Sequence, residues 1–343
     1  MKAAVVILNW NGEKFLDKFL PVLIENTNLL EYDLFVADNG SSDNSIELIK
    51  NKFPQVKTIL LNQNYGFAEG YNRALSQIES NYYILLNSDV EVSNNWLDIL
   101  YEYMELNTDI AACQPKIKSY YDRDSFEHAG AAGGFIDKYG FPFCRGRIFN
   151  SIEQDRGQYD FKTDVFWATG ACLMIRSEVF WKVGGFDNEF FAHMEEIDLC
   201  WRLNSRGYRV TCKPQSVVYH VGGGTLNSSS PQKTYLNFRN NLLLLYKNLP
   251  QSLLKRTLFY RFFFDYLAVL QMLFTLKFAD ARSVIRARRD FHKIKLSFLE
   301  KRNINITHAT HVFCDVMYQR AIVFDYYIKR KKTYKQLLKH KSK

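Results

Sequence analysis

The chain has 343 residues, of which 47% are hydrophobic, and a formal net charge of +9. Its length is sufficient for a large buried core, and its composition excludes wholesale disorder. The positive charge is concentrated in residues 281–343, which contain 17 Lys and Arg against 4 Asp and Glu, whereas the rest of the chain is mildly acidic. Such a basic segment suits a polyanion, either a nucleic acid or an anionic membrane surface.

The six cysteines have neither the spacing of a disulfide framework nor that of a metal site, which predicts free thiols in a reducing cytosol. The N-terminal stretch "MKAAVVILNWNG" is predicted to be a strand and not a signal peptide. The longest apolar stretch, residues 262–278, contains Asp265 and Lys277, and the uncharged part between them is too short to cross about 30 Å of hydrocarbon. We therefore expect no transmembrane helix.

Apolar strands alternate with helical patterns through residues 3–89. Strands are predicted at 3–10, 32–40, 56–66 and 82–89, and helices at 15–25, 41–53 and 67–78. This order predicts an α/β fold with a mostly parallel central sheet flanked by helices. Polar residues end every strand: Asn9 and Asn11, Asp38 and Asn39, Asn62 and Asn64, and Asn87 and Asp89. Because parallel strands share one carboxyl edge, these side chains are expected to line one crevice.

The later part of the chain is less regular at first. Between Cys113 and Trp167, flexible binding loops and a small β insertion both fit the pattern. A strand and two helices follow within residues 164–208, and further β structure is predicted from Arg209. The Gly-, Ser- and Pro-rich residues 222–232 are a predicted linker. From about Lys233 the pattern is helical, basic and rich in aromatic residues, so we expect one domain at 1–228 and a helical C-terminal extension at 229–343.

The strand ends carry the first candidate site residues. Asp89 offers the hard oxygen ligand that Mg²⁺ or Mn²⁺ prefers, and Asn87 offers an amide oxygen or a hydrogen bond, although a plain polar turn is the alternative. Asp38 can accept an N–H from a pyrimidine ring, while Asp43 is expected to cap the following helix in part. Gly66 permits close approach to a helix N-terminus, where a phosphate is favoured.

A second set of candidates lies later in the chain. Glu195, Glu196 and Asp198 open a predicted helix, where they can simply stabilise its dipole, and Asp198 can pair with Arg202 on the helix surface. Crowded carboxylates can also raise one pKa toward neutrality, which suits a general base. His220 ends a strand and precedes three glycines, so it is a candidate for contact with a metal or a diphosphate.

The chain resembles the family 2 glycosyltransferases of the GT-A fold, and most closely their bacterial rhamnosyltransferase-like branch. The resemblance covers about residues 3–226 and is carried, in order, by "VVILNWNG", "VADNGSSD", "NYGFAEGYNRA", "YYILLNSDVEV", "ATGACLMIRSEVFWKVGGFDNEFF", "MEEIDLCWRL" and "VYHVGGGT". It implies a GT-A domain at 1–228, a nucleotide-diphosphate sugar donor, a divalent metal (Mg²⁺ or Mn²⁺), and inverting transfer to a hydroxyl of a glycan or lipid-linked acceptor in surface polysaccharide synthesis.

The resemblance also implies roles for single residues. Asp89 is the retained acid of an Asp-x-Asp motif and binds the metal, with Asn87 at the first acid position, and His220 supports the metal or the diphosphate. Glu196 takes the place of the usual base, with Glu195 and Asp198 as the alternatives. The remaining donor-binding positions are Asn9 and Asp38 at the nucleobase, with Asn11 beside them, and Asn64 and Gly66 near the nucleotide.

Three expectations concern the tail and rival functions. Aromatic and basic residues interleaved after residue 229 predict peripheral contact with an anionic membrane at the inner face of the cytoplasmic membrane, and the alternative is a helical domain packed on the core. A sugar nucleotidyltransferase would need a Gly-rich, basic loop after the first strand, and "NWNGEKF" matches poorly. A non-enzymatic polyanion-binding protein is the other rival, but no nucleic-acid module is recognised, so no nucleic-acid partner is expected.

Overall fold

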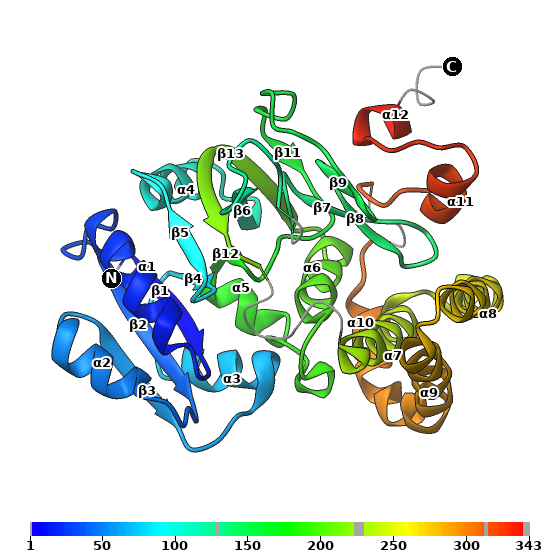
Figure 1. Ribbon diagram of the computed structural model, residues 1–343, viewed down its shortest axis with the longest axis horizontal. Coiled ribbons are helices and arrows are strands. Elements are labelled where there is room, and N and C mark those ends of the chain that lie inside the picture. Colours follow the sequence, from blue (N-terminus) through cyan, green and yellow to red (C-terminus); the bar gives the residue numbers. More distant parts are fainter. Residues whose placement is uncertain (1, 128–129, 223–229, 312–314, 339–343) are drawn as a thin grey trace.

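A computed structural model describes residues 2–127, 130–222, 230–311 and 315–338. Its centre is a nine-stranded sheet (Figure 1). In spatial order the strands are β11 (Thr163–Asp164), β13 (Arg209–His220), β6 (Ile110–Ser119), β12 (Cys172–Arg176), β4 (Tyr82–Leu86), β1 (Ala3–Asn9), β2 (Tyr32–Asn39) and β3 (Lys57–Leu61), with β5 (Val90–Val92) paired to β13. β3, β2, β1 and β4 are parallel, which confirms the predicted sheet.

Both faces of the parallel strands are buried. Ala4 and Val6 of β1 pack into one apolar cluster, whereas Val5 and Ile7 pack into the other. Burial on both faces explains why these strands are continuous apolar runs in the sequence. The helices contributing to the second cluster are α1 (Glu13–Glu25), α2 (Ser45–Lys52) and α4 (Trp96–Glu105), and those contributing to the first include α3 (Gly66–Leu75), α5 (Ser177–Lys182) and α6 (Glu195–Ser205).

The irregular region contains a second, antiparallel sheet, so the β insertion is the correct alternative there. Its four strands are β7 (Gly134–Ile136), β8 (Pro142–Cys144), β9 (Arg147–Ile148) and β10 (Ser151–Ile152). The five described cysteines are buried and unpaired, in agreement with the prediction of free thiols, and Cys314 lies outside the described residues.

The C-terminal region is helical, as predicted. Its helices are α7 (Pro231–Asn248), α8 (Gln251–Phe274), α9 (Phe278–Ile294), α10 (Leu299–His308), α11 (Ile322–Tyr327) and α12 (Tyr334–Leu338). α7 starts where the sequence favours a helix start, because Ser230 Oγ accepts a hydrogen bond from Gln232 N and Pro231 occupies the first turn. Most of the predicted linker, residues 223–229, lies outside the described part of the chain.

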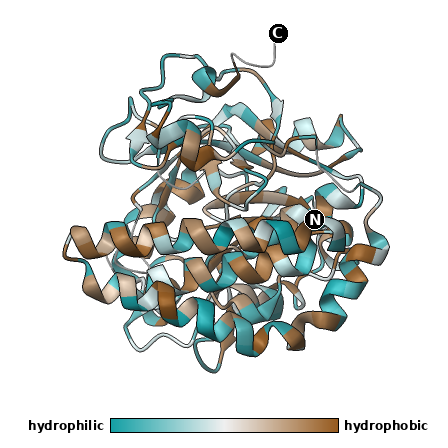
Figure 2. Cartoon of the chain, turned by 90° about the vertical axis from the view of Figure 1, so that its right-hand side faces the viewer, coloured by the Kyte–Doolittle hydropathy of each residue, from teal (hydrophilic) through white to brown (hydrophobic). Residues whose placement is uncertain are grey.

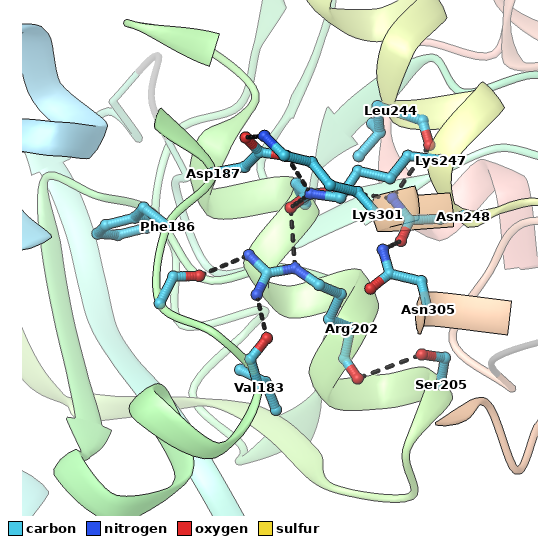
Figure 3. Close-up of polar contacts among 12 residues, drawn as sticks. Val183, Phe186, Asp187, Arg202, Ser205, Leu244, Lys247, Asn248, Lys301 and Asn305 are labelled. Carbon is cyan, nitrogen blue, oxygen red and sulfur yellow. Dashed lines mark hydrogen bonds and ion pairs between the residues drawn. The ribbon is translucent and has the colours of Figure 1, made fainter. Parts of the chain in front are cut away.

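Buried charges join these helices to the sheet domain (Figure 3). Lys247 Nζ of α7 lies 2.6 Å from Asp187 Oδ2 and 2.7 Å from Asp198 Oδ2, and Lys301 Nζ of α10 lies 2.6 Å from Asp187 Oδ1. Burial raises the pKa of Asp187, but the charges of Lys247 and Lys301 outweigh it and lower this pKa to about 2. The helical region is therefore packed on the core.

The last described segment returns to the small sheet. Lys138 N donates to Tyr318 O (2.9 Å), Ile322 N donates to Asp137 Oδ2 (2.9 Å), and Tyr334 N donates to Glu153 Oε1 (3.1 Å). This segment, residues 315–338, therefore has fixed contacts with the strands around Asp137 and is part of the folded body.

Candidate active site

The ends of β1 and β2 form one hydrogen-bonded unit. Asn9 and Asp38 lie opposite each other in the parallel register, and Asn9 Nδ2 donates to Asp38 Oδ1 (3.2 Å). Ser41 N donates to Asp38 Oδ2 (2.9 Å), and Ser42 N donates to Asn11 Oδ1 (2.7 Å). Asn9 Oδ1 is buried without a partner among the described residues, which leaves a buried acceptor for a ligand.

Two nearby polar residues have local roles. Asp43 Oδ1 accepts from Ser45 N (3.1 Å), and Asp43 Oδ2 accepts from Glu13 N (3.0 Å), so this carboxylate joins the starts of α1 and α2. Burial raises the pKa of Asp43, but the hydrogen bonds from Ser45 and Glu13 outweigh burial, so the pKa is lowered overall. Asn62 is bound to its neighbour, since its Oδ1 accepts from Tyr65 Oη (2.6 Å).

Asn39 and Asn64 build the turn into α3. Asn39 Nδ2 donates to Asn64 Oδ1 (3.2 Å), which also accepts from Gly66 N (2.8 Å). Gly66 has a φ of +76°, and a Cβ there would lie 2.6 Å from the Phe191 ring, so the position requires glycine. The prediction of a phosphate at this helix start meets an obstacle, because Phe67 N already donates to Phe191 O (2.8 Å).

Asp89 and His220 are brought together by strand pairing. β5 runs antiparallel to β13, with Val90 opposite His220. His220 Nε2 lies 3.1 Å from Asp89 Oδ1, and His220 Nδ1 lies 3.2 Å from Glu127 Oε2. The Asn87 amide nitrogen is 3.4 Å from His220 Nε2.

The two flanking carboxylates determine the charge of His220. Burial lowers the pKa of His220, but the hydrogen bonds and charges of Asp89 and Glu127 outweigh burial and raise this pKa to about 10. Burial likewise raises the pKa of Asp89, and His220 reverses the shift, so the pKa of Asp89 is lowered. The arrangement is a buried imidazolium between two carboxylates.

The residues fit a divalent cation at Asp89, but in this arrangement they do not fit one at His220. One carboxylate plus substrate phosphates is a common Mg²⁺ environment, and Asp89 can supply that carboxylate. Both ring nitrogens of His220 face carboxylates, with Asp89 Oδ1 at 3.1 Å from Nε2 and Glu127 Oε2 at 3.2 Å from Nδ1, so both are already engaged by protein groups. Among the residues that the structure describes, no three His, Cys, Asp or Glu side chains converge on a cation position.

A strained loop precedes the acidic helix α6. Phe191, His193 and Met194 have φ values of 62°, 69° and 75°, in the left-handed region that side chains rarely adopt. Asn240 of α7 is fully buried and holds this loop. Its Nδ2 donates to three backbone carbonyls, those of Phe190 (2.9 Å), Ala192 (2.9 Å) and His193 (2.8 Å).

Glu195 and Glu196 open α6 directly after this loop. Glu195 is 5% exposed and Glu196 is the more accessible of the two. Oε2 of each carboxylate is buried without a hydrogen-bond partner among the described residues. Burial raises the pKa of Glu196 to about 7, and burial together with the neighbouring Glu196 raises the pKa of Glu195 well above its usual range. A carboxylate that changes its charge near neutral pH is suited to general base catalysis.

Asp198 is placed differently from these two residues. The expected pair with Arg202 forms, at 2.9 Å between Arg202 Nε and Asp198 Oδ2, but its expected position on the helix surface is wrong. Both side chains are buried because α7 covers this part of α6, and Lys247 and Asn248 also bind Asp198. With both oxygens bonded inside the fold, Asp198 has a structural role here.

Glu196 of the acid pair and Glu127, which contacts His220, both act electrostatically on one buried thiol. Burial raises the pKa of the Cys144 thiol to about 12, and the charges of Glu127 and Glu196 contribute to this shift. Cys144 therefore lies close to both carboxylates. Because Glu127 contacts His220, which contacts Asp89, these residues form one connected region.

The nucleobase unit borders the same region. A Cβ on Gly12 would lie 2.2 Å from Asn9 Oδ1 and 3.5 Å from Ser88 Oγ, so the loops after β1 and β4 are adjacent. The contact between Gly66 and Phe191 connects α3 with the loop before α6. Asn9, Asp38 and the loop that carries Asp89 thus lie together at the carboxyl ends of β1, β2 and β4, as the strand order implied.

Sequence reasoning missed several residues of this region. Burial lowers the pKa of Arg147 to about 10, and burial and Arg147 together lower the pKa of Lys233, while Glu127 acts in the opposite direction on both. Two cations therefore interact electrostatically with Glu127, which also faces His220. The only sequence signal was the basic stretch "CRGRIF", and its other arginine, Arg145, is buried and donates to Ala132 O (2.9 Å).

Replacing Glu195 by Gln is expected to stabilise the protein at alkaline pH. Because the folded state raises the pKa of Glu195, it binds more protons than the unfolded chain, and the unfolding free energy falls as pH rises above about 4.5. Glu195→Gln should add on the order of 1–3 kcal/mol at pH 8 and little at pH 4. Urea unfolding of wild type and variant at both pH values measures the gain in unfolding free energy. An equal gain at the two pH values would contradict a raised pKa of Glu195.

The comparisons with known proteins identify the family. A sequence profile described as "Glycosyl transferase family 2" matches residues 4–184, which is more than half of the chain. The chain belongs to glycosyl transferase family 2. The matched segment of this family 2 chain includes Asn9, Asp38, Asn64 and Asp89 and ends before Glu195.

Relatives of this family 2 chain include two rhamnosyltransferases. The chain is 26% identical over 234 residues to the N-acetylglucosaminyl-diphospho-decaprenol L-rhamnosyltransferase of Mycobacterium tuberculosis, covering 63% of this chain and 75% of that protein. It is 26% identical over 263 residues to the dTDP-rhamnosyl transferase RfbF of Shigella flexneri, covering 71% and 79%. These matches confirm the resemblance to the bacterial rhamnosyltransferases.

A solved structure confirms the fold. The crystal structure of GalNAc-T7 with UDP, GalNAc and Mn²⁺ matches with a TM-score of 0.58 at 17% sequence identity, covering 90% of this chain and 57% of that longer one. The family 2 chain thus has the GT-A fold, with a mostly parallel sheet flanked by helices and a helical C-terminal region.

Proposed function

We propose that this family 2 glycosyltransferase moves a sugar from a nucleotide diphosphate to a hydroxyl of a lipid-linked or glycan acceptor in bacterial surface polysaccharide synthesis, with inversion. The observation that carries the proposal is the carboxylate pair Glu195–Glu196 at the start of α6, in which each side chain has a buried oxygen without a hydrogen-bond partner among the described residues. A relative whose name includes diphospho-decaprenol supports a lipid-linked acceptor. Family membership favours this function over a nucleotidyltransferase or a polyanion-binding protein.

The transfer is a single displacement. The acceptor hydroxyl gives its proton to Glu196 as its oxygen forms a bond with the anomeric carbon. The bond from that carbon to the diphosphate oxygen breaks on the opposite face, and the nucleoside diphosphate leaves with the electron pair. Attack from the face opposite the leaving group inverts the anomeric centre. Glu196 suits this role because its pKa of about 7 leaves a useful fraction of carboxylate at neutral pH.

The leaving diphosphate requires positive charge. Asp89 would hold a Mg²⁺ or Mn²⁺ ion, which neutralises the charge of the departing diphosphate when bound. Arg147, Lys233 and the His220 imidazolium add protein cations next to Glu127 in the same region. Asn87, next to His220, takes part in this donor site.

The nucleoside end of the donor lies along β1 and β2. Asp38 and the partnerless Oδ1 of Asn9 offer acceptors for the N–H groups of a base, and Asn11 orders the loop beside them. Asn64 and Gly66 shape the turn at the nucleotide, where glycine leaves the backbone accessible.

A thermal-shift panel tests the donor assignment. The protein is mixed with dTDP-, UDP- and GDP-sugars, each with and without MnCl₂ or MgCl₂. We expect one base class to raise the melting temperature, and the rise to depend on the metal, because binding to the native state alone stabilises it. A shift produced by nucleoside triphosphate together with a sugar 1-phosphate, and by no nucleotide sugar, would support a nucleotidyltransferase instead.

Asp89→Ala is expected to weaken metal-dependent donor binding by about tenfold or more, because it removes the carboxylate that the ion needs. Donor titration calorimetry with and without Mn²⁺, well below the unfolding temperature, measures the effect. Asp17→Ala is the matched control, since Asp17 forms an exposed pair with Lys52 away from the site. Unchanged Mn²⁺-dependent affinity in Asp89→Ala would remove Asp89 from the donor site.

A lipid-linked acceptor has a consequence for location. It places the enzyme in the cytoplasm at the inner face of the membrane, where nucleotide sugars and the diphospho-lipid meet.

A further inference from the structure

The two charged side chains in the middle of α8, Arg261 and Asp265, face the protein. Arg261 and Asp265 are buried, and Arg261 Nη2 lies 2.9 Å from Asp265 Oδ1. Arg288 of α9 pairs with Asp265 Oδ2 at 2.5 Å. Arg261 Nη1 also donates to Tyr139 O (3.0 Å), which ties the helix to the loop between β7 and β8. These contacts hold α8 along the surface of the molecule.

The opposite face of α8 is apolar and exposed. More than half of each of five side chains is exposed at helical spacing, namely Phe259, Phe263, Leu267, Leu270 and Phe274. We call these five residues the α8 apolar face. No side chain at residues 257–276, all of them described, is both charged and exposed. Figure 2 faces the side on which α8 and α9 lie and shows hydrophobic residues along these long helices.

This distribution corrects one expectation. Asp265 does not interrupt the apolar surface, because its charge is buried against Arg261 and Arg288. By length and composition alone, α8 is the one described helix that could cross a membrane, and 22% of its most apolar window is buried. The contacts to Tyr139 and α9 instead favour a helix that lies flat at an interface.

Positive charge surrounds the α8 apolar face. Lys255 and Arg256 are exposed before it and Lys277 is exposed after it, while Arg282 and Arg289 are exposed on the adjacent α9. An apolar face with a cationic rim complements acyl chains beneath anionic headgroups. A symmetric dimer through the same face would bring these cations together, so a second copy is the poorer partner.

We propose that the α8 apolar face inserts into an anionic membrane surface, with the cationic rim at the headgroups. The membrane contact itself does not depend on the proposed function. Only its purpose does, which is to bring a lipid-linked acceptor within reach of the active site. The proposal narrows the expected membrane contact from residues 229–343 to α8, because Phe291 and Phe298 in the later part of that region are buried in the core. Deleting 281–343 would therefore disturb the fold as well as any membrane contact.

The test is co-sedimentation of the full chain with vesicles of phosphatidylcholine alone or mixed with phosphatidylglycerol. Wild type should bind the anionic vesicles, and the double variant Leu267→Glu, Leu270→Glu should bind at least about tenfold more weakly. Lys277→Gln should weaken binding by about fivefold, the effect of one basic residue near the surface. Leu106→Glu, an equivalent change at an 83% exposed leucine on the sheet domain, should bind as wild type does.

Two further measurements make the outcome decisive. All substituted leucines are exposed, so the circular dichroism melts of the variants should match that of wild type. The thermal shifts produced by the donor should also be unchanged, because the α8 apolar face is not part of the proposed donor site. Failure of this inference is thereby distinguished from failure of the proposed function. Equal vesicle binding by wild type and the double variant would overturn the proposal. It would also be overturned if wild type fails to bind vesicles, or forms a dimer that the double variant abolishes.

Discussion

Replacing Glu196 by Gln should lower the transfer rate by about 100- to 10 000-fold, with donor affinity within about twofold of wild type. The amide keeps the shape of the side chain but cannot take the proton of the acceptor hydroxyl. The wild-type rate should rise with pH through about 7, because the base must be deprotonated and burial raises its pKa to about 7. Initial rates between pH 5.5 and 8.5 and donor titration calorimetry measure both effects.

Matched variants separate Glu196 from its neighbours. Glu189→Gln makes the same chemical change at an exposed carboxylate just before the strained loop, and it should keep the wild-type rate and pH profile. Full activity of Glu196→Gln, together with a large loss in Glu195→Gln, would transfer the role of base to Glu195. Full activity of both variants would refute a base at the start of α6.

Replacing Lys247 by Met should lower the unfolding free energy by about 3–5 kcal/mol, because it leaves buried carboxylates without their shared cation. Among the residues that the structure describes, Asp198 would keep Arg202 as its one cationic partner and Asp187 would keep Lys301. Denaturant unfolding measures the change. Lys182→Met, which alters an exposed lysine on α5, is the control and should change stability by less than about 0.5 kcal/mol.

A double-mutant cycle tests the cause of this loss. If the cost comes from an unpaired buried charge, Asp198→Asn combined with Lys247→Met should be less destabilising than the sum of the two single variants. Additive effects would show that Lys247 and Asp198 stabilise the protein independently. A single unfolding transition in all variants would indicate that the sheet domain and α7 unfold together.

The gathering of polar residues at one end of β1, β2 and β4 was predictable because parallel strands share an edge. Once β1, β2 and β4 were recognised as parallel, the gathering of Asn9, Asp38 and Asp89 followed from the order of the elements. The contact of Asp89 with His220 was harder to predict from the sequence, because it depends on β5 pairing with β13, which is far away along the chain. Nothing in the local pattern around Asp89 indicates that pairing.

The residues that were missed act through tertiary contacts. Asn240 is an ordinary polar residue in a helical pattern, and its three hydrogen bonds exist only because α7 docks on the loop before α6. The sequence suggested Asp198 as a surface partner of Arg202, whereas the covering helix buries the pair. Asp265 was read as a break in an apolar stretch, because its burial depends on Arg288 of a different helix as well as on Arg261 of its own.

Asn240 holds the strained loop before α6, and Lys247 and Lys301 hold Asp187 and Asp198 on either side of that loop. These contacts affect how such enzymes can be recombined. Grafting the C-terminal helices of a relative onto this sheet domain, for instance to change acceptor range, would break these contacts unless the graft supplied equivalent side chains. A crossover point between Asp187 and Lys301 would therefore separate a buried carboxylate from at least one of its counterions.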